Sequence, residues 1–258
     1  YYEFWPSSGR TISKAQVIRD VNLMKDMNVN AIRLSHYPRA QYFYDVCDSL
    51  GIFVADELAG WQAYYDTEVG MKLQQEMVTA DEDHPCIVMW NNGNEGGYNF
   101  DLDKYFGELD IQKRPVNHPG SIFGDLDSEH YPDFHALSEK LSLGNAVVFP
   151  DEFVHALYDG GAGAALQDYW SLMERSPRSA GGFMWDFADA CVVRTDKGDS
   201  LDCAGNQDAD GVVGPYREKT GSYYAIKKIW APVQIEQESL PENWGQRLRV
   251  ENHFFYTD

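Results

Sequence analysis

The amino-acid sequence predicts an α/β fold, a (β/α)8 barrel, from three observations. Short apolar runs alternate along the chain with helix-like stretches, which implies parallel strands joined by helical crossovers. Runs such as 52–55 are continuously apolar, so these strands are expected to be buried on both faces. The length of 258 residues is close to the roughly 250 residues of a single barrel.

The elements follow from periodicity and end signals. Ser13 with Gln16 three residues later is a capping-box pattern that predicts a helix after Ser13, and Gly51 is in the position of a C-terminal cap. The expected strands lie at 30–34, 52–55, 87–90, 114–118, 125–131, 146–149 and 182–187. The expected helices lie at 14–27, 42–50, 73–83, 133–141, 166–175 and 223–230. The stretch 100–111 is too short for a long helix with its loops.

Composition excludes several classes of function. Lys and Arg number 21 against 41 Asp and Glu, a net charge of −20, which disfavours nucleic acids and anionic membrane surfaces as partners. No run approaches the roughly 18 apolar residues of a membrane span. The four cysteines are scattered, and most of them are predicted to be small buried side chains. Pairing of Cys191 with Cys203 is the alternative in an oxidising compartment.

Polar residues gather directly after the expected strands, at the end of the barrel where active sites lie. Glu95 and Glu152 each follow a strand and are the best candidates for catalysis. Two carboxylates facing each other suit glycoside hydrolysis, in which one protonates the leaving oxygen and the other attacks the anomeric carbon or activates water. The alternative is that either one is a solvated loop carboxylate.

Neighbouring side chains favour the catalytic interpretation. Asn94 offers a neutral amide to a sugar hydroxyl, and Trp185 offers a flat ring to a pyranose face. Arg33 and His36 follow an earlier strand. Each of these two is alternatively a structural residue, Arg33 paired with a buried carboxylate and His36 buried in the core.

At these residues the sequence resembles the catalytic domain of glycoside hydrolase family 2, the family of β-galactosidases, β-glucuronidases and β-mannosidases. The resemblance is strongest at HPCIVMWNNGNE (84–95) and covers about residues 14 to 235. The other matching segments are 20–25, 28–38, 47–52, 56–57, 151–153, 181–189 and 210–213.

The resemblance implies a retaining exo-β-glycosidase, a β-galactosidase first of all, acting on an oligosaccharide or β-glycoside. Glu95 would be the acid/base and Glu152 the nucleophile, with their carboxyl groups about 5–5.5 Å apart. Because Glu95 must start protonated, its pKa is expected above the usual value of about 4.3. The implied substrate-binding residues are Arg33, which would also orient the nucleophile, Asn94 at the 2-hydroxyl, His36 and Trp185. Asp56 and Trp61 are further candidates for substrate binding.

Departures from the family pattern limit the assignment. A Glu-x-His magnesium motif is absent after Asp56-Glu57, so we predict neither a metal nor another cofactor. The Asn-x-Lys of glucuronidases is also absent, although Arg217 or Lys219 could meet an anionic sugar. The aspartates at 196–210 are predicted to be solvated rather than to bind a cation.

Three further alternatives stay open. Trp61 with its neighbours at 64–65 forms either an aromatic subsite wall or a loop that packs on another domain. The sugar could be glucuronic acid, mannose or an algal galactan unit. A catalytically inactive carbohydrate-binding barrel is the alternative from another class, disfavoured because both Glu95 and Glu152 are present.

The resemblance also implies a domain organisation. It makes the first expected strand the second of the barrel, so residues 1–235 would form a barrel whose strand one lies upstream. Residues 236–258 would be a linker and the start of a following β-sandwich. The expected protein partners are therefore β-sandwich domains upstream and downstream in a longer chain, and a homo-oligomer is allowed.

Overall fold

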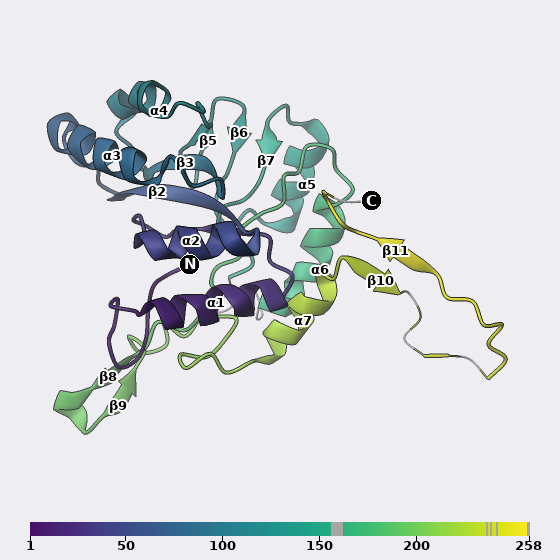
Figure 1. Ribbon diagram of the computed structural model, residues 1–258. Helices are drawn as coiled ribbons and strands as arrows, with labels where there is room; N and C mark the ends of the chain where they lie inside the picture. Colours follow the sequence, from purple (N-terminus) through teal and green to yellow (C-terminus); the bar gives the residue numbers. More distant parts are fainter. Residues whose placement is uncertain (156–161, 236, 238, 241, 257–258) are drawn as a thin grey trace.

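The first half of the chain forms a parallel sheet covered by helices (Figure 1). The structure, a computed structural model, describes residues 1–155, 162–235, 237, 239–240 and 242–256. The strands pair in chain order, β1 (Ala31–Arg33), β2 (Phe53–Trp61), β3 (Ile87–Asn94) and β4 (Val116–Asn117). Helix α1 (Lys14–Asp26) precedes β1, α2 (Gln41–Leu50) joins β1 to β2, and α3 (Thr67–Asp81) joins β2 to β3. The predicted alternation of strands and helices is confirmed here.

The helix ends follow the capping chemistry. The Ser13 amide donates to Gln16 Oε1 at 2.7 Å, and the Gln16 amide donates back to Ser13 Oγ at 3.3 Å, which completes the predicted capping box. Gly51 ends α2 in the left-handed region at φ 67°. Helix α3 begins six residues earlier than predicted because Asp66 caps it, accepting from the Val69 amide at 3.0 Å.

The second half of the barrel is less regular. A short helix α4 (Asp103–Leu109) follows the single turn η1 (Phe100–Leu102), as the short stretch at 100–111 predicts. A small sheet contains β5 (Ile122–Phe123), β6 (Leu126–Asp127) and β7 (Val147–Val148). Helices α5 (Phe134–Leu143), α6 (Ala162–Met173) and α7 (Gly221–Ile229) cover this half.

The strand predicted at 182–187 is not a continuous strand. Its residues pair first with the segment after β7, through the Phe153–Met184 bridge, and then with 212–213, where the Val213 amide donates to Phe187 O at 3.0 Å. Because the hydrogen-bond partner changes along the segment, no ladder of two or more residues forms. The segment nevertheless occupies the place of a barrel strand between its two neighbours.

Two antiparallel hairpins extend from the barrel (Figure 1). Strands β8 (Val192–Arg194) and β9 (Ser200–Asp202) flank the turn η2 (Thr195–Lys197) and bring Cys191 and Cys203 together in a disulfide. The prediction of unpaired cysteines was wrong for these two, because residues that flank paired strands face each other. Cys47 and Cys86 are free and buried, as predicted.

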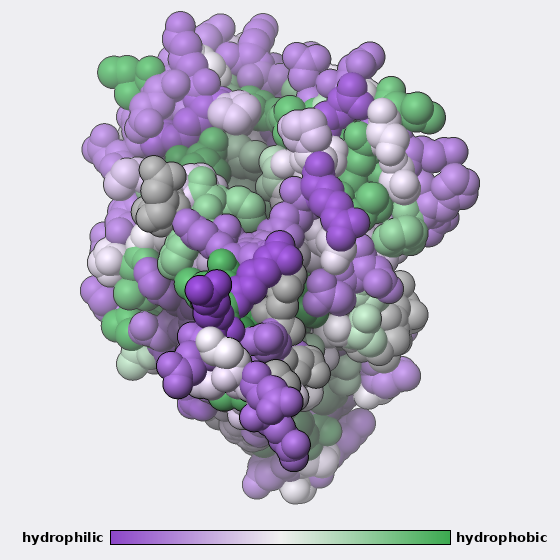
Figure 2. Space-filling model, turned by 90° about the vertical axis from the view of Figure 1, so that its right-hand side faces the viewer, coloured by the Kyte–Doolittle hydropathy of each residue, from purple (hydrophilic) through white to green (hydrophobic). Residues whose placement is uncertain are grey.

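The second hairpin joins β10 (Val233–Ile235) to β11 (Val250–Asn252) and projects away from the helices. Figure 2 views the molecule from this side and shows hydrophobic residues in patches among hydrophilic ones. Its second strand lies within residues 236–258, for which the sequence predicts a linker and the start of a β-sandwich. A following β-sandwich stays a prediction.

Strand β1 is the edge strand of its sheet. On its free side the Tyr1 amino group donates to Arg33 O at 2.9 Å, and the Ser35 amide donates to Tyr1 O at 3.3 Å. Residues 1–12 add no strand to the sheet; their backbone forms an isolated bridge between Trp5 and Gly9. A cavity of about 690 Å³ opens beside β1, lined by apolar side chains that include Ile32, Phe149, Phe183 and Trp230. No helix in the described ranges has the length and apolar character to cross a membrane.

Candidate active site

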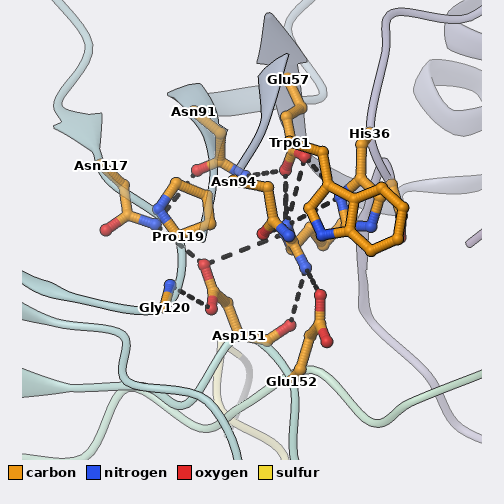
Figure 3. Close-up of polar contacts among 12 residues, drawn as sticks. His36, Glu57, Trp61, Asn91, Asn94, Asn117, Pro119, Gly120, Asp151 and Glu152 are labelled. Atoms are coloured by element: carbon orange, nitrogen blue, oxygen red, sulfur yellow. Dashed lines mark hydrogen bonds and ion pairs between the residues drawn. The ribbon is translucent and has the colours of Figure 1, made fainter. Parts of the chain in front are cut away.

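A buried arginine, Arg33, organises the carboxyl ends of the strands. Figure 3 shows the acceptors around it, Glu57, Asn94 and Glu152. Arg33, the last residue of β1, donates from Nε to Glu57 Oε2 at 2.9 Å and from Nη1 to Glu152 Oε1 at 2.6 Å. Its Nη2 donates to Asn94 Oδ1 at 2.6 Å. The guanidinium therefore joins the ends of β1, β2 and β3 to the segment after β7.

The charges in this cluster are held by pairing. Burial lowers the pKa of Arg33, but the nearby carboxylates of Glu57, Asp151 and Glu152 raise it by a larger amount. The net shift of the pKa is therefore upward. Burial raises the pKa of Glu57, and Arg33 and His36 lower it by more. Each buried charge thus has a neighbour of opposite charge. Removing Arg33 would leave the buried carboxylates without a compensating positive charge.

Glu152 is fixed at both carboxylate oxygens. Oε1 accepts from Arg33, and Oε2 accepts from the Tyr131 hydroxyl at 2.5 Å. The residue is 3% exposed. A carboxylate held in one orientation suits a nucleophile.

Glu95 lies in a more open position and has a different set of partners. Its Oε2 accepts from Trp61 Nε1 at 3.0 Å and from Gln62 Nε2 at 3.1 Å, and its Oε1 lies 3.0 Å from His130 Nδ1. Burial raises the pKa of Glu95, but these donors lower it by a larger amount. The net shift of the pKa is therefore downward. The expectation of a raised pKa is therefore wrong for the unliganded protein, because three donors stabilise the carboxylate.

The two carboxylates approach each other closely. A carboxylate oxygen of Glu95, one of Glu152 and a ring nitrogen of His130 all lie within 4.8 Å of one another. The backbone at Glu95 is in the left-handed region at φ 45°, and Tyr131 is at φ 47°. Such conformations in side chains other than glycine are typical of functional sites, where the surrounding structure holds them.

An aromatic wall borders the carboxylates. The His36 ring stacks between Trp61, at a centroid distance of 6.0 Å, and Trp185, at 5.7 Å. His36 Nδ1 lies 2.8 Å from Glu57 Oε1, which fixes the ring. Trp61 is 61% exposed, so its ring face is open to a ligand.

Two further polar groups point to ligand binding. Asn94 is fully buried, and its Nδ2 has no hydrogen-bond partner, so a donor is available beside Arg33. Trp185 donates from Nε1 to Asp210 Oδ2 at 3.0 Å, which orients the indole. Arg33, His36, Asn94, Trp61 and Trp185 therefore come together with Glu95 and Glu152.

Asp56 does not join this group. Its side chain accepts from the Tyr44 hydroxyl at 2.9 Å on the opposite face of β2, against α2. Burial, and next the negative charge of Asp81, raise its pKa well above the usual range. Because side chains alternate along a strand, Glu57 points into the barrel when Asp56 points out. The expectation that Asp56 lines the site is corrected, and Glu57 takes that place.

Four residues of the site were not identified from the sequence: Glu57, His130, Tyr131 and Asp151. The alternation of β2 could have identified Glu57. His130 and Tyr131 follow the two-residue strand β6, where no periodicity indicates which way a side chain points. Asp151 precedes the nucleophile candidate and accepts from Asn117 Nδ2 at 3.1 Å and from the Gly120 amide at 3.2 Å.

Few of the described residues are placed to bind a metal ion or an anionic sugar. Among the described residues, the group that could hold a metal ion is Glu95, His130 and Glu152. In the acidic loop, Asp196 and Asp202 pair with Arg194 at 2.7 and 2.8 Å. Arg217 is buried against Asp20 at 2.7 Å, so it does not point to a sugar.

Solved structures share this fold. A β-glucuronidase from Bifidobacterium dentium, complexed with coumarin-3-O-glucuronide, matches with a TM-score of 0.68 and 20% identity over 89% of this chain and 45% of that chain. A Faecalibacterium prausnitzii β-glucuronidase matches with a TM-score of 0.66 and 23% identity, over 89% of this chain and 47% of that one. These likenesses support the TIM barrel.

Sequence comparison gives the family. A β-galactosidase of Pseudoalteromonas haloplanktis is 29% identical over 76% of this chain, and one of Alteromonas mediterranea is 28% identical over 100% of it. The chain spans 22% and 28% of the length of these two relatives. The family described as "Glycosyl hydrolases family 2, TIM barrel domain" matches residues 2–73 and 65–207. The chain therefore belongs to glycosyl hydrolase family 2, through the TIM barrel domain of that family.

Proposed function

We propose that the protein hydrolyses terminal, non-reducing β-glycosidic bonds with retention of configuration, and that its substrate is a β-galactoside. The observation that carries the proposal is the pair of carboxylates, with oxygens of Glu95 and Glu152 within 4.8 Å. Retaining enzymes have carboxyl groups about 5–5.5 Å apart, and inverting enzymes about 6.5–9.5 Å. The short approach favours retention.

In the proposed reaction, Glu152 attacks the anomeric carbon while Glu95 protonates the leaving oxygen. Arg33 and Tyr131 hold both oxygens of Glu152, so the attacking group needs little reorganisation. The C–O bond to the leaving group breaks as the ester to Glu152 forms. Glu95 then takes a proton from water, and the water oxygen displaces Glu152 from the sugar.

The sugar would stack on the wall of Trp61, His36 and Trp185, and the free Nδ2 of Asn94 would donate to a hydroxyl beside the bond that breaks. A galactoside is favoured because the curated relatives named above are β-galactosidases. A glucuronide is disfavoured because Arg217 is committed to Asp20 and Lys219 lies 3.2 Å from Asp26. Neither cation is then available to a sugar carboxylate.

A panel of aryl β-glycosides tests the proposal. We expect hydrolysis of the galactoside, with the β-anomer of the sugar as the first product by NMR. E152Q should lower kcat by about 10⁴–10⁶-fold, the usual loss when a nucleophile is removed. E139Q, at an exposed glutamate of α5, is the matched control and should retain activity.

Other results of the panel would replace the proposal. Preference for the glucuronide or mannoside would keep the mechanism and change the sugar. Formation of the α-anomer first would exclude retention. Tight binding of sugars without any hydrolysis would favour the inactive carbohydrate-binding barrel.

A further inference from the structure

His130 lies between the two carboxylates in the loop after β6. Its Nδ1 is 3.0 Å from Glu95 Oε1 and 3.6 Å from Glu152 Oε2, and its Nε2 is 2.7 Å from Asp151 Oδ1. The imidazole is only 8% exposed. Three carboxylates therefore surround one buried ring.

The ring is held in place from two sides. Asp151 is fixed by Asn117 Nδ2 and the Gly120 amide (Figure 3). Its Oδ1 is therefore a stationary negative charge 2.7 Å from Nε2, although the two atoms do not align as a hydrogen bond. A Cβ on Gly120 would lie 3.2 Å from the His130 ring, so only glycine allows the ring this close. The hydrogen bond of the ring joins Nδ1 to Glu95 Oε1, so these two atoms share a single proton, and the negative charge of Asp151 beside Nε2 favours the doubly protonated ring.

We propose that His130 is a positioning residue that stores the catalytic proton of Glu95, holding it on Nδ1 in the unliganded protein and returning it to Glu95 when a glycoside binds. The inference rests on the proposed retaining hydrolysis and names the source of its proton. It also explains why Glu95 accepts hydrogen bonds as an ionised carboxylate does, although its proposed function requires a protonated acid.

The charges around the ring agree with this storage. Burial lowers the pKa of His130, but Asp151 and Glu152 raise it by more, against a smaller opposing effect of Arg33. The phenol of Tyr131 lies at the edge of the ring, at a centroid distance of 5.8 Å. The pKa of Glu95 is shifted in the opposite direction. Both directions are those that storage of the proton on Nδ1 requires.

The proton balance closes over one turnover. In the first half, the proton moves from Nδ1 to Glu95 and then to the leaving oxygen, the glycosidic bond breaks, and Glu152 becomes a neutral ester. His130 and Glu152 thus lose opposite charges together. In the second half, water gives its proton to Glu95 and then to Nδ1, and the ester breaks to restore the Glu152 carboxylate.

A titration of the His130 ring nitrogens by ¹⁵N NMR tests the storage without any substrate. We expect His130, assigned from the spectrum of H130Q, to be protonated at pH values above the ordinary histidine midpoint of about 6.5. In D151N the midpoint should fall by about 1–3 units, the usual effect of losing one neighbouring opposite charge. A ring that is neutral at pH 6.5 in the unaltered protein would overturn the inference.

Kinetics separate proton storage from a merely structural role. In H130Q the proton must stay on Glu95 alone, so the basic limb of the kcat/KM profile should move to lower pH by about one unit or more. Hydrolysis of an alkyl β-glycoside should fall about 10²-fold, whereas a dinitrophenyl β-glycoside, whose leaving group needs no proton, should change little. H135Q, at an exposed histidine of α5, is the control.

The outcomes distinguish the two proposals. Equal losses on both substrates, or an unmoved basic limb, would overturn the role of His130 while leaving retaining hydrolysis intact. A protein that hydrolyses no glycoside would refute the proposed function, and the NMR titration would still decide where the shared proton lies.

Discussion

The two sides of strand β1 are organised by different forces. At its carboxyl end, Arg33 is 3% exposed and joins Glu57, Asn94 and Glu152 in a network in which each charge has partners. Along its free edge, apolar side chains line a cavity of about 690 Å³. Protein interiors rarely contain voids much larger than a water molecule, so this edge is incompletely packed while the active-site end is complete.

The difference separates an end of the strand that is packed within the described residues from an edge that is not. All members of the polar network around Arg33 come from β1, β2, β3 and the segment after β7. The free edge of β1 offers backbone groups and apolar surface that a further strand would cover. We propose that strand one of the barrel fills this cavity, as the sequence predicts, with Tyr1 already paired beside Arg33 and Ser35.

The largest expected effect is the loss of the cation at the active-site end. R33M should lower the free energy of unfolding by about 3–5 kcal/mol, because buried carboxylates at Glu57 and Glu152 would be left without their counter-charge. Urea unfolding measures the change. R194M, at a half-exposed arginine of the β8 hairpin, is the control and should shift the midpoint much less. Equal shifts would show that the network adds no special stability.

A pair of phenylalanine truncations compares the packed core with the open edge. Phe106 is fully buried against Trp90, so F106A should cost about 3–5 kcal/mol of unfolding free energy. Phe183 lines the cavity and is only partly buried, so F183A should cost about half as much or less. Equal costs in urea unfolding would mean that the cavity is closed in solution.

The regular half of the barrel could be predicted because its signals are local. Strands β1, β2 and β3 are short apolar runs that end in polar residues, and Glu95 follows β3 directly. Glu152 was also found as a carboxylate that follows an expected strand, but its role as the nucleophile needed the family resemblance, because β7 has only two residues and Glu152 lies four residues beyond its end. The predicted strand at 182–187 forms no continuous ladder because its hydrogen-bond partners lie on separate segments. A local sequence pattern cannot predict which segments these are.

The remaining differences concern contacts between distant segments. The donors that lower the pKa of Glu95 come from residue 61 at the end of β2 and from residues 62 and 130 in loops. The direction of the pKa shift therefore depends on loop positions that the sequence does not predict. The disulfide between Cys191 and Cys203 depends on the register of a hairpin. Which of Asp56 and Glu57 faces the site depends on the alternation of side chains along β2. Substitution of each residue tests this assignment directly.

The smallest expected effect comes from the residue that faces away from the network. D56N keeps an acceptor for the Tyr44 hydroxyl and the Glu57 amide and supplies a donor to Asp81, so the local hydrogen bonds can persist. We expect D56N to retain glycosidase activity, whereas E57Q should lose it because Arg33 and His36 lose their partner. Loss of activity in D56N with an intact fold would return Asp56 to the site.

The pH dependence of stability gives a second measure of the same contrast. Burial and the charge of Asp81 raise the pKa of Asp56 above its unfolded value, so the folded chain keeps a proton that the unfolded chain releases. The resulting stability is present below the unfolded pKa and is lost as pH rises through the folded pKa. Asparagine cannot release this proton, so D56N should flatten the decline. At pH 8 it should be as stable as the unaltered protein or up to about 1 kcal/mol more stable, measured by urea unfolding. A steeper decline in D56N would mean that Asp56 is ionised in the fold and paired there.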